Sequence, residues 1–226
     1  MFEHGNFGFG KRLLLIVIES NTIIIHNVII LPPMSFHDTP LVGQHVRLEP
    51  LQQHHLPGLK TAIEDGQLHQ LMVTTVSDPS KVNEFFTYIQ KMLATGSMMT
   101  YATIAQASNQ VIGSSRLMNT DWEHQRTEIG GTFIAKSYQR TAINTEAKYL
   151  MLTHAFETLQ FNRVAFRTDF LNQRSRTAIE RLGAKFEGIL RNHMVMPDGR
   201  IRDTVVYSII KHEWPGIKAF LEEKLR

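Results

Sequence analysis

The sequence contains no cysteine among its 226 residues. That absence excludes disulfides, thiolate nucleophiles, zinc–cysteine sites and iron–sulfur clusters. A strong charge imbalance is absent too, because 24 Lys and Arg stand against 21 Asp and Glu, a formal net charge of +3. A dedicated nucleic-acid binder carries a dense basic stripe, so we expect no such role. The pI of about 9.2 leaves modest nucleic-acid binding as a minor alternative, which steep salt dependence would reveal.

Long uninterrupted hydrophobic runs are also missing. A transmembrane helix needs about 20 consecutive apolar residues, and polar residues at 19–21 and 26–27 interrupt the most apolar region. A secretory signal fits poorly, because its hydrophobic part (13–18) is short and no small-residue cleavage site follows. We therefore predict no membrane association and a cytoplasmic location.

Residues 1–33 are far richer in β-branched side chains than the rest of the chain. They form two short strands (13–18 and 22–30) around a turn at 19–21, or they are an upstream extension of a native chain that starts at Met34. We favour the second interpretation, with 1–33 as an apolar N-terminal extension and 34–226 as a single domain. The intact mass of the natively expressed protein distinguishes the two.

The remaining chain can build a core, because 42% of its residues are hydrophobic and 20% charged over the full length. Periodicity, caps and turn residues predict the order β-α-α-β-β-β-α-β-α-β-β, followed by a terminal helix, which argues for a mixed α/β sheet in one domain. The predicted strands are 45–51, 101–105, 111–119, 126–135, 164–169, 186–195 and 204–210. The predicted helices are 52–71, 79–93, 144–159, 175–182 and 214–225.

The most informative stretch is the predicted strand 126–135 with the loop and helix that follow. A helix N-terminus offers unpaired N–H groups and a positive dipole end to anions, and Arg140 adds charge in the loop. The junction therefore suits a pyrophosphate. The alternative is a plain β–α junction in which Asn144 caps the helix.

Several motifs in this part of the chain resemble one family. The stretch TEIGGTFIA followed by YQRTAIN resembles motif A of the GNAT superfamily, the acyl-CoA-dependent N-acyltransferases, and TDFLNQRSRTAIERLGAKFEG resembles the motif that follows it. The ending RNHMVMPDGRIRDTVVYSI, then EW, resembles the RimJ/RimL-type branch. The similarity covers about 41–214. It implies a GNAT-like single domain: a central twisted, mostly antiparallel sheet with two splayed parallel strands and flanking helices.

The resemblance also implies where acetyl-CoA, or another acyl-CoA, binds as co-substrate. It places the ligand between the strands 126–135 and 164–169, with the pantetheine beside Thr132, Phe133 and Ile134. Asn172 is expected to hydrogen-bond the pantetheine arm, and Arg174 or Arg176 to meet CoA phosphates. The loop expected to hold the pyrophosphate consists of Gln139, Arg140, Thr141, Ala142, Ile143 and Asn144.

Two departures from the family pattern concern that loop and the general acid. Ala142 and Asn144 occupy the glycine-type positions of the loop. Ile179 stands where many members carry a tyrosine, so we expect Ser175 to serve the departing thiolate instead; its alternative is a helix cap. Glu128 is our candidate base, acting through water; its alternative is a surface carboxylate.

The predicted activity is transfer of an acetyl or other short acyl group from acyl-CoA to a primary amine, by direct attack on the thioester. The acceptor stays open between a protein N-terminus and a small amine, and a homodimer is an open possibility. The missing tyrosine and altered loop motivate an alternative, a non-catalytic CoA-binding regulatory module. We predict no metal, since the adjacent His54 and His55 should point to different sides of a helix.

Overall fold

The computed structural model describes residues 12–19, 22–29, 36 and 39–226. The chain divides into two compact units, Met1–Ser35 and Phe36–Arg226. In the first, β1 (Arg12–Glu19) and β2 (Thr22–Ile29) pair antiparallel from Arg12↔Ile29 to Glu19↔Thr22. These are the two strands predicted there, although most of the predicted turn, and residue 30, lie outside the described residues. The position of the native start stays a prediction.

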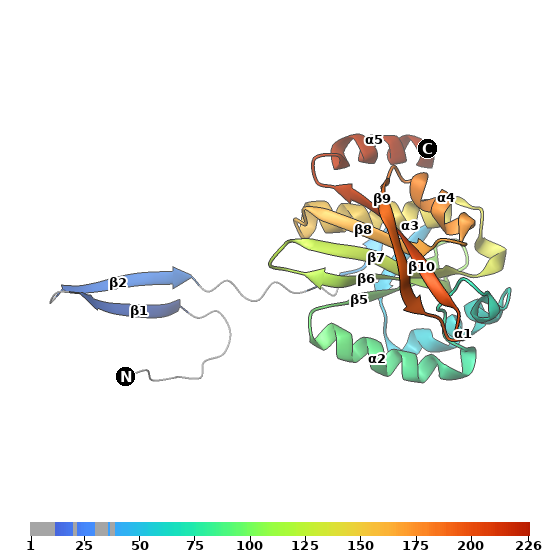
Figure 1. Ribbon diagram of the computed structural model, residues 1–226, viewed down its shortest axis with the longest axis horizontal. Coiled ribbons are helices and arrows are strands. Elements are labelled where there is room, and N and C mark those ends of the chain that lie inside the picture. The colour runs from blue at the N-terminus through green and yellow to red at the C-terminus, as the bar shows by residue number, and fades with distance from the viewer. Residues whose placement is uncertain (1–11, 20–21, 30–35, 37–38) are drawn as a thin grey trace. The chain divides into compact units, whose positions relative to one another are not determined.

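The larger unit is built on an eight-stranded sheet in the order β3-β4-β5-β6-β7-β8-β10-β9 (Figure 1). All neighbouring strands are antiparallel except β7 and β8. The mixed, mostly antiparallel α/β sheet predicted from the sequence is therefore confirmed. The strands are β3 (Leu41–Val42), β4 (Val46–Pro50), β5 (Met99–Ala105), β6 (Gln110–Asp121), β7 (Arg126–Ile134), β8 (Arg163–Asp169), β9 (Lys185–Val195) and β10 (Ile201–Ile210).

Five α-helices accompany this sheet in the described chain: α1 (Leu56–Glu64), α2 (Val82–Ala94), α3 (Ala142–Thr153), α4 (Gln173–Glu180) and α5 (Trp214–Leu225). Short 3₁₀ helices flank them, η1 (Gln53–His55), η2 (Leu68–Gln70), η3 (Pro79–Lys81) and η4 (Lys136–Tyr138), and a π-helix, η5 (His154–Thr158), follows α3. The helix predicted over 52–71 is interrupted, because Gly66 and Gln67 take positive φ angles of 91° and 48°. Such left-handed residues end a helix.

The core forms where the helices cover the sheet, and one carboxylate ties α3 to it. Leu48 of β4, Met151 of α3 and Tyr207 of β10 are fully buried. Glu146 of α3 accepts hydrogen bonds from the backbone N–H groups of residues 44–46 at 2.7, 2.7 and 2.8 Å. These bonds fix the start of α3 against the β3–β4 turn. Among the described helices, none is long and apolar enough to span a membrane.

Candidate active site

The two parallel strands stop pairing after their first three residue pairs. β7 and β8 pair only at Arg126↔Arg163, Thr127↔Val164 and Glu128↔Ala165, yet β7 continues to Ile134 and β8 to Asp169. Past Glu128 the edge of β7 that faces β8 is therefore without ladder partners in the described chain. Backbone N–H and C=O groups need partners, so this edge can pair with a ligand. The predicted parallel pairing and its divergence toward the C-terminal ends are confirmed.

A β-bulge turns β7 away from β8. Ser114 pairs with Phe133 and Arg116 with Gly130, so one residue of β6 lies opposite two of β7, Gly131 and Thr132. Gly131 has a φ of 55°, and a Cβ atom there would lie 2.7 Å from the guanidinium carbon of Arg116. Only glycine suits both the angle and the space. The Gly130–Gly131 pair of the sequence thus explains where the strands separate.

Thr132, which is predicted to lie beside the pantetheine, is exposed, and its hydroxyl accepts a hydrogen bond from a buried lysine. Lys148 Nζ donates hydrogen bonds to Ser115 Oγ at 2.7 Å and Thr132 Oγ1 at 2.5 Å, and the two hydroxyls lie 2.7 Å apart. Burial without a carboxylate lowers the Lys148 pKa to about 7. Sequence reasoning missed Lys148, although it stands three residues before Met151, on the apolar side of the predicted helix.

Glu128, the candidate base, is buried, with 6% of its surface exposed. Its Oε2 accepts a hydrogen bond from Asn119 Nδ2 at 3.0 Å and pairs with Arg167 Nε at 3.3 Å. Its Oε1 has no hydrogen-bond partner among the described residues. Burial raises the Glu128 pKa, while Asn119, Arg167, Arg202 and His193 act against that rise. The surface-carboxylate alternative is therefore wrong, and a raised pKa in a buried carboxyl suits a base.

A cleft of about 640 Å³ opens beside Glu128. It lies between the β6–β7 turn and the first half of β8, with Arg163, Ala165 and Arg167 on one wall. Asn119 reaches over Glu128 because β6 carries an irregularity between Met118 and Asp121, where Asn119 takes a φ of 50°. Because Glu128 lines this cleft, a second substrate that binds there would lie beside its carboxylate.

The predicted pyrophosphate loop leads directly into α3. Thr141 is the N-cap: its Oγ1 accepts a hydrogen bond from Ile143 N at 3.4 Å and donates one to Tyr138 O at 2.8 Å. The prediction that Asn144 caps the helix is wrong, since α3 already begins at Ala142. Neither Ala142 nor Asn144 has a positive φ, whereas Arg140 has one of 63°. The backbone is therefore not strained by the lack of glycine at Ala142 and Asn144.

Gln139 connects this loop to the end of β7 and to the start of α4, which follows β8. Its Nε2 donates to Ile134 O at 2.8 Å, and its Oε1 accepts from Arg174 Nη2 at 3.2 Å. The structure thus brings together three of the predicted ligand-binding residues at the C-terminal ends of β7 and β8. Phe133 and Ile134 themselves are buried, with 8% and 7% exposed.

Asn172 is the N-cap of α4, and its Oδ1 accepts a hydrogen bond from Ser175 N at 3.0 Å. The alternative in which Ser175 caps the helix is therefore wrong, because that role belongs to Asn172. In the described chain the Ser175 hydroxyl and the Asn172 amide nitrogen make no hydrogen bond, so both can meet a ligand. Among the described residues, no hydrogen bond joins Ser175 to Glu128. Ile179 is 8% exposed and belongs to the core.

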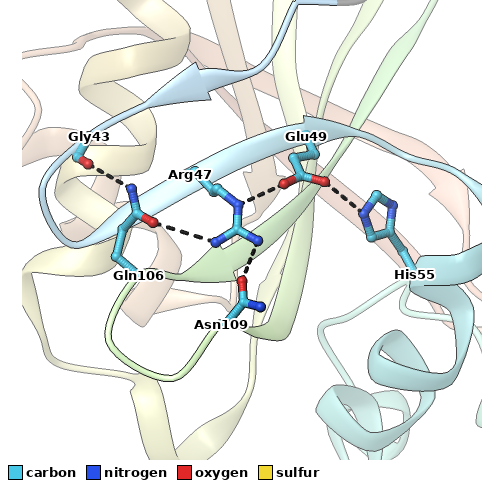
Figure 2. Close-up of polar contacts among 6 residues, drawn as sticks. All are labelled: Gly43, Arg47, Glu49, His55, Gln106 and Asn109. Carbon is cyan, nitrogen blue, oxygen red and sulfur yellow. Dashed lines mark hydrogen bonds and ion pairs between the residues drawn. The ribbon is translucent and has the colours of Figure 1, made fainter.

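A cluster outside this region has the composition of a metal site. Ligand atoms of Glu49, His54 and His55 lie within 4.8 Å of one another, and the two imidazole centroids are 3.9 Å apart. The prediction that these histidines point to different sides is wrong. Figure 2 shows that Arg47 Nε contacts Glu49 Oε1, at 2.6 Å, and that His55 Nε2 contacts Glu49 Oε2, at 3.1 Å. His55 Nδ1 accepts from Gln52 N at 3.1 Å.

Both ring nitrogens of His55 are thus used, and the Arg47 guanidinium already neutralises Glu49. Arg47 is the main cause that lowers the Glu49 pKa. A cation would have to displace this guanidinium and break the His55 hydrogen bonds. The cluster therefore acts as a polar network that fixes β4 to the turn before α1.

Comparison with known proteins agrees with this geometry. The acetyltransferase (GNAT) domain family matches residues 45–185. A Bacillus subtilis (strain 168) protein named "Putative ribosomal N-acetyltransferase YdaF" is 39% identical over 106 residues, which cover 47% of this chain and 57% of that protein. The chain thus spans less than two thirds of this curated relative.

Solved structures match over more of the chain. A GCN5-related N-acetyltransferase from Brucella melitensis is 32% identical, with a TM-score of 0.77, over 85% of this chain and 87% of that one. Mycobacterium smegmatis RimJ in complex with CoA-disulfide is 21% identical, with a TM-score of 0.68, over 79% and 88%; at that identity it shows the shared fold. The predicted resemblance to the GNAT superfamily is confirmed, and the chain belongs to the GNAT acetyltransferase family.

Proposed function

We propose that residues 34–226 form an acyltransferase domain that transfers an acetyl group from acetyl-CoA to a primary amine. The observation that carries the proposal is the end of the β7–β8 ladder at Glu128↔Ala165. Both strands continue beyond it, so the free peptide groups of β7 can pair with the amides of a pantetheine arm. A helix N-terminus lies at the end of the same strand, where a pyrophosphate is favoured.

The donor is proposed to lie along β7 with its pyrophosphate at Gln139, Arg140, Thr141, Ala142, Ile143 and Asn144. Thr132 would flank the pantetheine, and the free Asn172 amide would donate to one of its carbonyl groups. Arg174 would add positive charge near the phosphates, since Gln139 already holds it beside the loop. The CoA-disulfide of the RimJ structure, which shares the fold, supports a CoA-type ligand.

The reaction would begin when Glu128 Oε1 takes a proton from the acceptor ammonium through water. The amine nitrogen then attacks the thioester carbon, and backbone N–H groups near the bulge stabilise the oxyanion. Collapse of the tetrahedral species breaks the C–S bond. The attacking nitrogen loses its extra proton, which passes by way of water, or of water and the Ser175 hydroxyl, to the CoA thiolate, so the products are the neutral amide and the CoA thiol.

The acceptor class is proposed from the name of one relative and from the cleft. The Bacillus subtilis relative is named for ribosomal N-acetylation, which supports a protein N-terminal amine. The cleft beside Glu128 supports a small amine as the other candidate acceptor. A cytoplasmic location and a homodimer stay predictions; fractionation of expressing cells and the mass in solution by light scattering test them.

An acyl-CoA turnover screen tests the proposal. Release of free CoA thiol is measured with acetyl-CoA against peptides with free N-termini and a panel of small amines. We expect thiol release that depends on the acceptor and an amide product of the expected mass. Tight CoA binding without turnover across both panels would instead favour the non-catalytic regulatory module.

A further inference from the structure

Arg116 of β6 carries a charge with no counter-charge in the described chain. Its Nε is buried and makes no hydrogen bond, and it forms no ion pair with any described carboxylate. The guanidinium carbon instead lies 4.6 Å above the Phe85 ring of α2. Burial lowers the Arg116 pKa to about 10, so the side chain stays charged at neutral pH. By contrast, the buried carboxylate Asp169 has a partner of opposite charge, Arg200.

This guanidinium lies where the thioester is expected. Arg116 pairs with Gly130 and Met118 with Glu128, so Arg116 and Glu128 project from the same face of the sheet. The guanidinium also lies against Gly131 at the bulge. Because two glycines separate the cation from the base, this part of the face holds no side chain of β7. A substrate group that binds along this part of the face would lie beside both residues.

Arg116 is half-buried and its Nε is buried without a hydrogen bond. A charge partly removed from water without a partner is costly, and the cation–π contact with Phe85 offsets only part of that cost. A guanidinium presents a planar set of donors that matches a carboxylate in two-point geometry. The partner that Arg116 lacks within the chain is therefore an anion of this shape. It must arrive with a substrate, since the position lies next to the reacting atoms.

We propose that Arg116 binds a carboxylate of a substrate, carried either by the acceptor near its amine or by the acyl chain of the donor. The inference rests on the proposed function and narrows its substrate class. A carboxylate on the acceptor would make amino acids, or acidic peptide N-termini, better substrates than neutral amines. A carboxylate on the donor would make a dicarboxylic acyl-CoA better than acetyl-CoA.

Two matched comparisons distinguish these sources. On the acceptor side, glycine and glutamate are compared with glycinamide and ethylamine, using acetyl-CoA. On the donor side, succinyl-CoA is compared with butyryl-CoA, which has the same number of acyl carbons. Each comparison uses wild type, Arg116→Met, Arg116→Lys and the surface control Arg181→Met. In one of them, KM for the carboxylate substrate should rise about 10- to 100-fold in Arg116→Met. KM for the uncharged substrate of the same comparison should not change. In Arg116→Lys, KM for the carboxylate substrate should lie between the values of wild type and Arg116→Met.

Equal use of charged and uncharged substrates by wild type, with no selective effect of Arg116→Met, would overturn the inference while the acyltransferase stands. Failure of every donor and acceptor would instead count against the proposed function. Binding then decides the inference: with CoA present, glycine or succinate should raise the melting temperature of wild type but not of a folded Arg116→Met. No shift in wild type with either carboxylate overturns it.

Discussion

Lys148 Nζ donates a hydrogen bond to Ser115 Oγ at 2.7 Å, from a position where only 5% of the lysine is exposed. Burial lowers the folded-state pKa to about 7, from an ordinary value of 10.5. Between these values the unfolded chain binds a proton that the folded protein does not, so stability rises with pH. Below pH 7 both states are charged, and the cost of burial is fully present.

Lys148→Met removes this titration with little change of volume. The variant should gain stability relative to wild type near pH 7, and the gain should shrink toward pH 10 by up to about 1.4 kcal/mol per pH unit. Denaturant unfolding at pH 7, 8.5 and 10 measures the trend. Lys91→Met, an exposed lysine on α2, is the control and should show no such trend. A pH-independent difference for Lys148→Met would show that Lys148 is charged in the fold.

Asn172 has two separable roles, because its Oδ1 caps α4 while its amide nitrogen is free. Asn172→Ala should cost about 1 kcal/mol of stability and raise KM for acetyl-CoA. Asn172→Asp keeps the capping oxygen but removes the donor, so it should keep the stability and still raise KM. Melting temperatures and initial rates against acetyl-CoA measure both. An unchanged KM in Asn172→Asp would leave Asn172 as a helix cap only.

Ser175 has a free hydroxyl one turn into the same helix end. Proton transfer by a placed group is worth about 10²–10⁴-fold, and water can replace a serine, so Ser175→Ala should lower kcat at the low end of this range or less. Stability and CoA affinity should stay at the wild-type level, since Asn172 provides the cap. A full kcat would mean that the thiolate leaves without help from Ser175.

Ala142 is the first residue of α3, inside the proposed pyrophosphate cradle. Ala142→Asp adds a carboxylate that the helix dipole itself favours, so the variant should fold. The same carboxylate should repel the phosphates and weaken CoA binding strongly by calorimetry. Ala142→Gly, which adds neither charge nor volume, is the matched control and should bind CoA nearly as wild type does. Equal CoA affinity of a folded Ala142→Asp would place the phosphates elsewhere.

The strand and helix order could be read from the sequence, because periodicity and turn residues are local signals. The predicted helix 79–93 follows Asp78, a residue type that favours helix starts, and Asp78 Oδ1 does accept a hydrogen bond from Ser80 N at 2.8 Å. The site was harder, since its contacts join distant segments. The Lys148 contact with Ser115, and the unpaired state of Arg116, depend on the register of β6 against β7. Local capping preference also pointed to the wrong residue at Asn144. The helix begins earlier, and its N-cap is Thr141, which lies three residues before Asn144 and has an extended backbone conformation.

The acid limb of the pH profile reports on Glu128. Burial raises its pKa, and a base must be unprotonated, so kcat/KM should fall as the pH drops through this raised pKa. Asn119 donates to the charged form and holds the pKa down. Asn119→Ala should therefore move the acid limb to higher pH, with CoA affinity unchanged. If the acid limb of Asn119→Ala lies at the same pH as that of wild type, the limb reports the titration of a group other than Glu128.

Glu128→Gln tests the account most directly, by initial rates of thiol release from acetyl-CoA between pH 5 and 9, with CoA affinity measured in parallel. The amide keeps the shape of the side chain but cannot accept the proton. We predict wild-type CoA affinity, a kcat lowered by about 10²-fold or more, and loss of the acid limb. Wild-type turnover with the same pH profile in Glu128→Gln would contradict the role of this carboxylate in the reaction.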